Sequence, residues 1–305
     1  MTRFYQILVL ISILFFISCS YSDFTTYRID DQDNFYNYYL FERNEENKNE
    51  NLIVFLDGST MHSSLGIKGS ILPWKSFSAA YFFQKKLSKE FDLVVPERMN
   101  MEAGKDYSED TVRLKEYTLE KRVETSVKCI NEVIKKKNYQ NIYILGYSEG
   151  GLILPMIYNS LNDQQSVKKL ISIAAGGKSY YDLMNATMKE KGFNESYIDS
   201  IISEIKKYPN SVTKFAFGHP YNKWNSFLYY NPLEEFKVIE IPILVIHGEQ
   251  DKNVSVEVSR FLKRKFDEYG MKNLTYIEIK NATHNFEEEA DQVILEIEKF
   301  IRSNQ

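Results

Sequence analysis

Several features that define other classes of protein are scarce in this chain of 305 residues. It has two cysteines, Cys19 and Cys129, and we expect no disulfide between them. The 38 basic and 42 acidic residues form no basic stripe or polybasic tract, so a nucleic-acid partner is not expected. No group of His, Cys and Glu has the spacing of a zinc site, and no glycine-rich phosphate loop is present. We therefore expect no cofactor and no metal.

The residues that are abundant suit a folded domain with a large core. Hydrophobic residues make up 43% of the chain and charged residues 26%, which supplies enough apolar side chains for a sizeable interior. The length allows one large domain or two small ones. Because no internal repeat or low-complexity linker divides the chain, we expect one domain over residues 34–305.

The N-terminus has the pattern of an export signal. Arg3 precedes a mostly apolar run over residues 4–17, which is shorter than the roughly 20 residues that cross a bilayer as a helix. Ser18-Cys19 at its end resembles the lipobox of bacterial lipoproteins, with Phe16 in place of the usual leucine. The resemblance implies that residues 1–18 are removed, that Cys19 is lipidated, and that the protein is exported and anchored at the bacterial cell envelope. Simple secretion and an uncleaved anchor are the alternatives.

Apolar runs that alternate with helical stretches predict the fold. Residues 19–33 are expected to form a polar tether, and residues 35–41 an edge strand. The further strands are expected at residues 51–56, 91–96, 141–145, 167–175, 241–248 and 273–280, and the main helices at residues 111–137, 256–269 and 286–302. This order predicts an α/β fold: a mostly parallel sheet with helices on both faces.

One long stretch interrupts the alternation. Residues 176–236 contain no strand-like run, but they contain helical segments rich in Tyr, Phe and Trp. An insertion at this point would lie over the carboxyl edge of the sheet as a lid. Most of its aromatic side chains are expected to pack into its own small core, and the remainder to line a substrate pocket.

A serine between glycines stands at the end of one predicted strand. Residues 146–150 read GYSEG, after the apolar run 141–145 and before an apolar helical segment. A serine hydroxyl is a poor nucleophile at neutral pH and needs an exposed, well-aimed position beside a base. A strand–turn–helix elbow supplies that exposure, because its glycines allow close backbone approach. We therefore interpret Ser148 as a nucleophile and not as an ordinary turn serine.

Two further strand ends carry residues that this chemistry needs. Asp251 follows one predicted strand within residues 247–254 (HGEQDKNV), and His284 follows the last strand within residues 281–286 (NATHNF). The carboxyl ends of parallel strands meet at one edge of the sheet, where catalytic residues of open α/β sheets lie. The order Ser, Asp, His is that of the α/β-hydrolase triad.

These segments together resemble the α/β-hydrolase family, over nearly the whole chain beyond the leader. The resemblance implies Ser148 as nucleophile, His284 as general base and acid, and Asp251 as the carboxylate that orients His284. It also implies an oxyanion hole made by the main-chain N–H groups of Glu149 and Ser59, although many relatives have histidine at the position of Asp57.

Other titratable residues have competing interpretations. Glu249 is an alternative triad acid, and His247 is expected to support the turn beneath Asp251. His62 follows the oxyanion loop and could approach substrate, whereas His219 is expected to be a surface or packing residue. Cys129 lies on a predicted helix and is expected to be a small buried hydrophobe.

The predicted function is hydrolysis of carboxylic esters through an acyl-enzyme, with a small acyl substrate. A serine peptidase is the first alternative, because the elbow also resembles that of the prolyl-oligopeptidase family. That family usually has a propeller domain before the hydrolase domain, and residues 19–50 are too few to form one. A non-catalytic envelope protein that binds ligand in an aromatic cleft is the second alternative.

Overall fold

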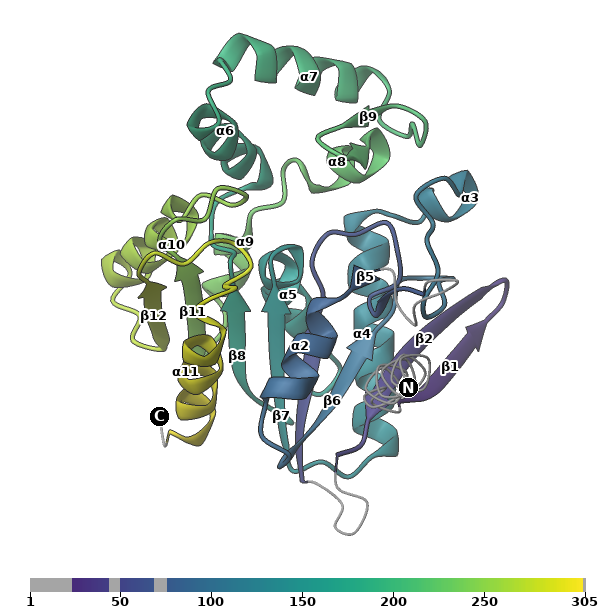
Figure 1. Cartoon of the computed structure of the whole chain (residues 1–305), viewed down its shortest axis with the longest axis vertical. Coiled ribbons are helices and arrows are strands. Elements are labelled where there is room, and N and C mark those ends of the chain that lie inside the picture. The colour runs from purple at the N-terminus through teal and green to yellow at the C-terminus, as the bar shows by residue number, and fades with distance from the viewer. Residues whose placement is uncertain (1–23, 44–49, 69–75, 304–305) are drawn as a thin grey trace, which may run out of the picture.

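The computed structural model describes residues 24–43, 50–68 and 76–303. Its centre is an eight-stranded sheet, whose strands lie side by side across Figure 1. The first two strands in the order below pair antiparallel, as do the second and third; every later neighbouring pair is parallel. Across the sheet the strands are β1 (Thr25–Asp31), β2 (Asn34–Phe41), β6 (Phe91–Pro96), β3 (Asn51–Leu56), β7 (Asn141–Tyr147), β8 (Val167–Ile173), β11 (Ile243–Gly248) and β12 (Leu274–Ile279).

Helices cover both faces of this sheet, which confirms the predicted fold class. The first face carries α4 (Leu119–Lys136), α5 (Glu149–Asn159) and α10 (Glu257–Glu268), and the second carries α2 (Ala79–Lys86) and α11 (Ala290–Arg302). Side chains of a strand alternate between the two faces. Within β3, Leu52 and Val54 accordingly belong to the first core, and Ile53 and Phe55 to the second.

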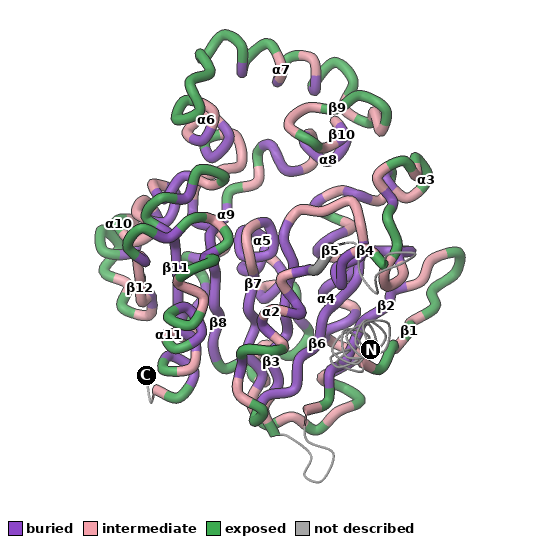
Figure 2. Tube along the Cα trace, viewed as in Figure 1, coloured by how far each residue is buried: buried purple, intermediate pink, exposed green. Residues whose placement is uncertain are grey.

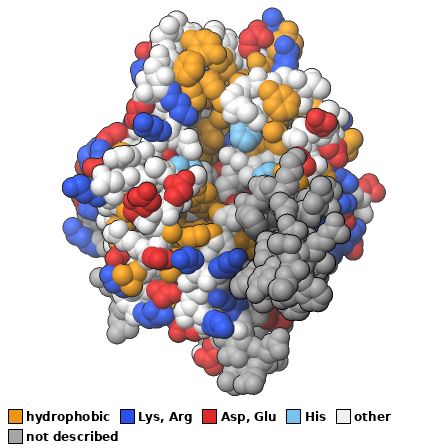
Figure 3. Space-filling model, viewed as in Figure 1, with side chains coloured by type: hydrophobic (Ala, Val, Ile, Leu, Met, Phe, Trp, Pro, Cys, Tyr) orange, Lys and Arg blue, Asp and Glu red, His pale blue; other side chains and the backbone are white. Residues whose placement is uncertain are grey.

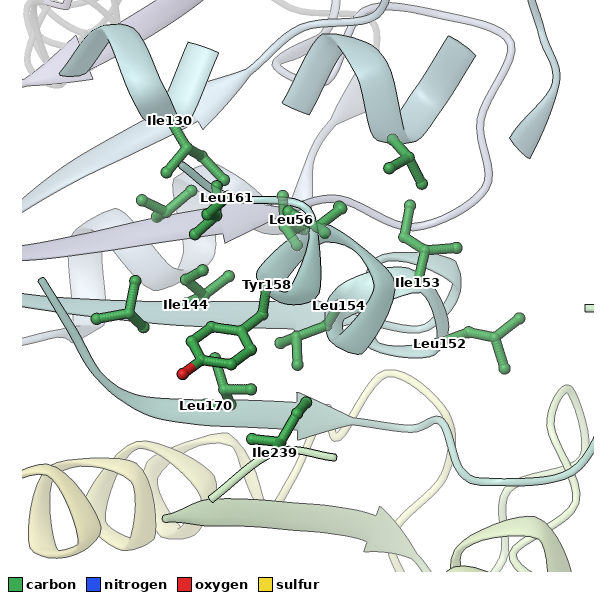
Figure 4. Packing of buried hydrophobic residues seen from close by; sticks show 14 of the residues in the cluster. Leu56, Ile130, Ile144, Leu152, Ile153, Leu154, Tyr158, Leu161, Leu170 and Ile239 are labelled. Carbon is green, nitrogen blue, oxygen red and sulfur yellow. The ribbon is translucent and has the colours of Figure 1, made fainter. Parts of the chain in front are cut away.

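The central strands and α5 form the most deeply buried part of the molecule (Figure 2). Figure 4 shows Leu154 and Tyr158 of α5 beside Ile144 and Leu170 of the adjacent strands. A helix that is apolar on nearly all sides is typical of a fully enclosed position. This packing holds both ends of the turn between β7 and α5 in place.

Most of the insertion (residues 176–236) lies beyond the carboxyl ends of the strands, at the top of Figure 1, and its final helix returns to pack against α5 on the first face of the sheet. It has its own small core, formed in part by Met184, Ile198, Ile202 and Trp224. Two two-residue strands interrupt its helices, at a position where the sequence indicated none. Its elements are α6 (Tyr180–Glu190), α7 (Glu195–Lys207), β9 (Phe215–Ala216), β10 (His219–Pro220), α8 (Tyr221–Phe227) and α9 (Pro232–Phe236).

The tether predicted over residues 19–33 is wrong for residues 25–31, because they form strand β1. This strand is mostly exposed, so its polar composition resembles that of a loop. It pairs with β2 from Thr25 opposite Leu40 to Asp31 opposite Asn34. The strand predicted as the edge of the sheet is therefore its second strand. Cys19 lies outside the described residues.

The single helix predicted over residues 111–137 is two helices. A short helix, α3 (Thr111–Leu114), is capped by Asp110, and α4 begins after Thr118, whose side chain accepts from the Lys121 N–H. Side chains that cap a helix N-terminus satisfy N–H groups that have no partner within the helix. The apolar spacing continues across this break, so periodicity alone did not reveal it. Cys129 is fully buried on α4, as expected.

The remaining short strands, β4 (Gly66–Ile67) and β5 (Ser76–Phe77), pair with each other. None of the helices in the described ranges has the length and apolar character needed to cross a membrane.

Candidate active site

Ser148 lies at the turn between β7 and α5, in a backbone conformation that residues other than glycine seldom adopt. Its φ is 53° and its ψ is −117°. Its N–H donates to the carbonyl of Ile173 at 2.8 Å, and its own carbonyl accepts from Leu152 at 3.0 Å. Such strained geometry persists where surrounding contacts over-determine it, and it is characteristic of a nucleophile elbow.

The glycines that flank this turn have identifiable steric reasons. A Cβ at Gly146 would lie 2.4 Å from the carbonyl oxygen of Gly150, because the turn folds back on itself. A Cβ at Gly150 would lie 2.1 Å from the carbonyl oxygen of Leu56, at the end of β3. Close contact of α5 with β3 therefore requires glycine at position 150.

The structure brings together the three residues that the sequence assigned to a triad. His284 Nε2 lies 3.2 Å from Ser148 Oγ, and His284 Nδ1 lies 2.7 Å from Asp251 Oδ2. The other carboxylate oxygen of Asp251 accepts from the N–H groups of Asn253 and Val254, at 2.8 Å and 2.9 Å. Burial raises the pKa of Asp251, but hydrogen bonds from His247 and His284 outweigh burial and hold the pKa below its ordinary range. An ionised Asp251 can orient His284 and stabilise its protonated form.

The competing acid and the neighbouring histidine occupy other places. Glu249 is exposed, and its carboxylate accepts from the N–H of Asn281 at 3.0 Å, not from His284. His247 is fully buried, with Nε2 3.2 Å from Asp251 Oδ2 and Nδ1 2.7 Å from Ser259 Oγ. It lies beneath the Asp251 turn, where the sequence interpretation placed it.

The loop after β3 lies directly beside the serine. A Cβ on Gly58 would lie 3.4 Å from the Cβ of Ser148. Ser59 and Glu149 line the same pocket as Ser148 and His284. Among the described residues, no protein acceptor is bonded to the main-chain N–H of either Ser59 or Glu149. Both donors are thus available to an oxygen atom of a bound molecule.

A pocket of about 660 Å³ opens in front of Ser148, between the sheet and the insertion. Figure 3 shows it as a hollow with apolar side chains inside and histidines around it. From the insertion side it is lined mainly by apolar residues: Tyr180, Leu183, Met184, Met188, Phe193, Phe217 and Trp224. His62 lines it too, as expected of a residue that follows the oxyanion loop.

His219 packs against Tyr117 and Trp224, which fits the expected packing role, but it also lines this pocket. Its Nδ1 lies 3.4 Å from the Tyr117 hydroxyl, and its ring lies edge-on to Trp224. Burial and the positive charges of Lys223 and Arg98 lower the pKa of His219 to about 3, so the ring is neutral at pH 7. Nothing local in the sequence distinguished it from a packing residue, because its neighbours come from other elements.

Sequence reasoning also missed a buried ion pair at the base of the pocket. Lys223 Nζ of α8 lies 3.0 Å from Glu149 Oε2, and both side chains are almost completely buried. Lys223 also donates to the hydroxyl of Tyr180 at 3.1 Å. Burial raises the pKa of Glu149, but the positive charges of Lys223, Arg122 and Arg98 lower it by a larger amount. The pKa is therefore below its ordinary value, and the carboxylate is ionised. The pair joins the insertion to the residue that follows Ser148.

Within the described part of the chain, no group of three His, Cys, Asp or Glu side chains could hold a metal ion. The arrangement instead offers a hydroxyl, a base, an orienting carboxylate and free N–H donors at the edge of a parallel sheet. This fold is that of the α/β-hydrolases.

Comparison with known families gives the same class. Residues 83–278 match the family described as "Serine hydrolase (FSH1)", which is more than half of the chain, and the chain belongs to this family. The match includes Ser148 and Asp251 and ends before His284. No curated protein matches the chain.

Solved structures with the same fold include esterases and a peptidase. The esterase Est1E from Butyrivibrio proteoclasticus is 18% identical, with a TM-score of 0.57 over 90% of this chain and 97% of that one. The Pyrococcus furiosus esterase Pf2001 is 13% identical, with a TM-score of 0.55 over 92% and 90%. The Pyrococcus horikoshii acylaminoacyl peptidase is 17% identical, with a TM-score of 0.59 over 94% of this chain and 42% of that one. At these identities the likeness shows the fold.

Proposed function

We propose that this serine hydrolase cleaves carboxylic esters through an acyl-enzyme, with Ser148, His284 and Asp251 as its triad. The observation that carries the proposal is the chain of contacts from Asp251 Oδ2 to His284 (2.7 Å) and from His284 to Ser148 Oγ (3.2 Å). Both distances lie at or near the hydrogen-bonding range expected between a nucleophile, its base and the group that orients the base.

Acylation begins when Ser148 Oγ attacks the ester carbonyl carbon and its proton passes to His284 Nε2. The carbonyl electrons move to the oxygen, and the N–H groups of Glu149 and Ser59 stabilise the resulting oxyanion. Collapse of this intermediate breaks the bond to the alcohol oxygen, which takes the proton from His284. Water then attacks the acyl-enzyme by the same route, which releases the carboxylic acid and restores the Ser148 hydroxyl.

The pocket, whose lining includes Lys191, supports a partly apolar acyl or alcohol group without a positive charge. The two carboxylates among its described lining residues are Asp57 and Glu149, and both are buried. Glu149 pairs with Lys223, and Asp57 lies beside Arg98 and Arg122. Neither carboxylate is placed to bind the free amine of a peptide. This favours esters over peptides with a free N-terminus, and the insertion serves as the lid of the site.

Covalent labelling tests the class, and a substrate panel tests the ester assignment. A fluorophosphonate should label the wild type but not Ser148→Ala. Nitrophenyl esters of increasing acyl length should be cleaved with higher kcat/KM than aminoacyl anilides. Preferential cleavage of anilides would replace the esterase with a peptidase, and a folded wild type that takes no label would indicate a ligand-binding protein.

We also propose that the protein is exported and anchored to the cell envelope by lipid on Cys19. The support is the Ser18-Cys19 sequence after the apolar run at residues 4–17. Cells fed labelled palmitate should incorporate label into the wild type and not into Cys19→Ser. Equal incorporation by both would contradict the anchor.

A further inference from the structure

Arg98 is a buried arginine that holds the loop beside the nucleophile. It follows β6 and is 4% exposed. Its Nη2 donates to the carbonyl oxygen of Gly58 at 2.7 Å. Its Nη1 donates to the His62 carbonyl and to Ser64 Oγ, both at 3.2 Å. One guanidinium thus fixes three points of the segment from Gly58 to Ser64.

The contact with Gly58 determines where the next N–H points. The Gly58 carbonyl and the Ser59 N–H belong to one peptide unit, and the described residues contain no cis peptide bond. In a trans peptide the C=O and the N–H point in opposite directions. Arg98 is absent from the residues that line the pocket, whereas Gly58 and Ser59 are among them. With its carbonyl drawn to Arg98, this peptide presents the Ser59 N–H away from Arg98, on the side of Ser148.

The guanidinium is itself held firmly. The neighbouring carboxylate of Glu97 lies 3.9 Å from Arg98 Nη1, where it offsets the buried positive charge. Glu97 also accepts from Ser63 Oγ at 2.6 Å, from the Ser64 N–H at 3.0 Å and from the Tyr39 hydroxyl at 3.2 Å. Charged hydrogen bonds of this kind are strong where water is excluded. The network connects β6 rigidly to the loop after β3.

We propose that Arg98 is a positioning residue for the oxyanion hole: it orients the Gly58–Ser59 peptide so that the Ser59 N–H receives the developing oxyanion. Arg98 touches no substrate atom and acts only through this peptide. The inference rests on the proposed ester hydrolysis and adds a residue that neither the elbow nor the triad identifies.

A second buried arginine is a matched control. Arg122 of α4 is 6% exposed, and its Nη2 donates to the Asp57 carbonyl at 2.6 Å. That carbonyl belongs to the preceding peptide, whose N–H is that of Gly58. Replacement of either arginine removes a buried charge; Arg122 loses one hydrogen bond to this loop and Arg98 loses three. The proposal requires that only Arg98 acts directly on the Ser59 donor.

The experiment compares Arg98→Met, Arg98→Lys and Arg122→Met with the wild type, at a temperature where each is folded. The measurements are kcat and KM for a nitrophenyl ester, and the inhibition constant of a trifluoromethyl ketone with the same acyl chain. This ketone forms a hemiketal oxyanion with Ser148 and so reports on the hole directly. A wild type without esterase activity or fluorophosphonate labelling would overturn the proposed function itself, which separates that failure from failure of this inference.

We expect Arg98→Met to lower kcat by about 100-fold and to weaken the ketone in the same proportion, with KM nearly unchanged. Arg98→Lys should recover part of both losses, because an ammonium can still donate to the Gly58 carbonyl. Arg122→Met should also lower thermal stability but change kcat and ketone affinity far less.

The inference would be overturned if Arg98→Met kept the wild-type kcat and ketone affinity, or if it changed KM alone. It would also be overturned if folded Arg122→Met lost as much kcat and ketone affinity as Arg98→Met. If Arg98→Met does not fold, Arg98→Lys decides. A fall of about tenfold in kcat with parallel loss of ketone affinity supports the positioning role, and wild-type values contradict it.

Discussion

The two walls of the pocket are built in different ways. On the sheet side, Ser148, Asp251 and His284 follow β7, β11 and β12, and the Ser148 and Asp251 turns are fixed by main-chain hydrogen bonds. On the insertion side, the pocket is lined by side chains that project from α6 and α8 and from the segments beside them. The first wall is part of the main core, whereas the second has a separate small core.

This difference assigns separate tasks to the two walls. Parallel strands end at a common edge, so Ser148, Asp251 and His284 take their spacing mainly from the sheet. Side chains on a separate helical layer can change without disturbing that spacing, so the insertion is suited to select the substrate. The buried pair of Glu149 and Lys223 is one point where the two walls depend on each other.

Replacement of Ser148 by alanine tests the sheet wall most severely. We expect kcat for a nitrophenyl ester to fall by about 10⁶-fold, because no other group can form the acyl-enzyme. The exposed Ser200 of α7 provides a control on the insertion, and Ser200→Ala should retain wild-type kcat. Substantial turnover by purified Ser148→Ala would show that another residue is the nucleophile.

Asp251→Asn should lower kcat by about 10⁴-fold, because an amide cannot hold His284 in the required tautomer or stabilise its charge. The matched substitution is Glu249→Gln, at the exposed competing acid, which should leave kcat near the wild-type value. Steady-state kinetics decide between the two residues. If the effects were reversed, Glu249 would be the triad acid.

Breaking the pair between the walls should cost stability. Glu149→Gln leaves Lys223 buried without its counter-charge, and Lys223→Met removes the nearest cation from the buried Glu149, which retains only Arg122 and Arg98. Each is expected to lower the free energy of unfolding by about 3–5 kcal/mol, measured by urea denaturation. The double variant should recover most of the loss, because no uncompensated charge stays buried. Additive losses in the double variant would contradict coupling between the walls.

The same pair predicts a dependence of stability on pH. The pKa of Glu149 is lower in the folded protein than in the unfolded chain. The stability that Glu149 contributes is therefore complete above its pKa in the unfolded chain, about 4.3. This stability is lost as the pH falls through the pKa of Glu149 in the folded protein. The free energy of unfolding can be measured by urea denaturation at pH 7 and at more acidic pH. Its decrease between these two conditions should be smaller for Glu149→Gln than for the wild type. Equal losses would mean that Glu149 does not titrate with folding.

The smallest effect is expected on the insertion wall. Met188 lines the pocket from α6, and Met188→Trp should reduce the room for a long acyl chain. We expect the ratio of kcat/KM between short-chain and long-chain esters to shift by about tenfold toward the short chain, with kcat for the short ester preserved. A uniform loss of kcat for all esters would show that the walls are not separable in this way.

Much of the sheet wall could be predicted from local sequence. The continuous apolar run at residues 51–56 and the serine between glycines after the strand ending near residue 145 identified β3 and the elbow. Strand β1 was missed because an exposed edge strand needs few apolar residues. The break between α3 and α4 was missed because the apolar spacing continues across it. The sequence signal for the break is Thr118, whose side chain caps the start of α4.

Patterns of neighbouring residues determine strands, helices and turns, because burial on one face or two imposes a fixed spacing on apolar side chains. Contacts between distant segments depend on how the layers pack. His284 reaches Ser148 and Arg98 reaches Gly58 because the sheet brings their segments together, and Lys223 reaches Glu149 because the insertion packs against the sheet. A buried lysine such as Lys223 looks like a surface residue in the sequence, because the carboxylate that compensates it, Glu149, lies elsewhere in the chain. Residue types therefore indicated the class of chemistry, and packing of the layers selected the groups that surround it.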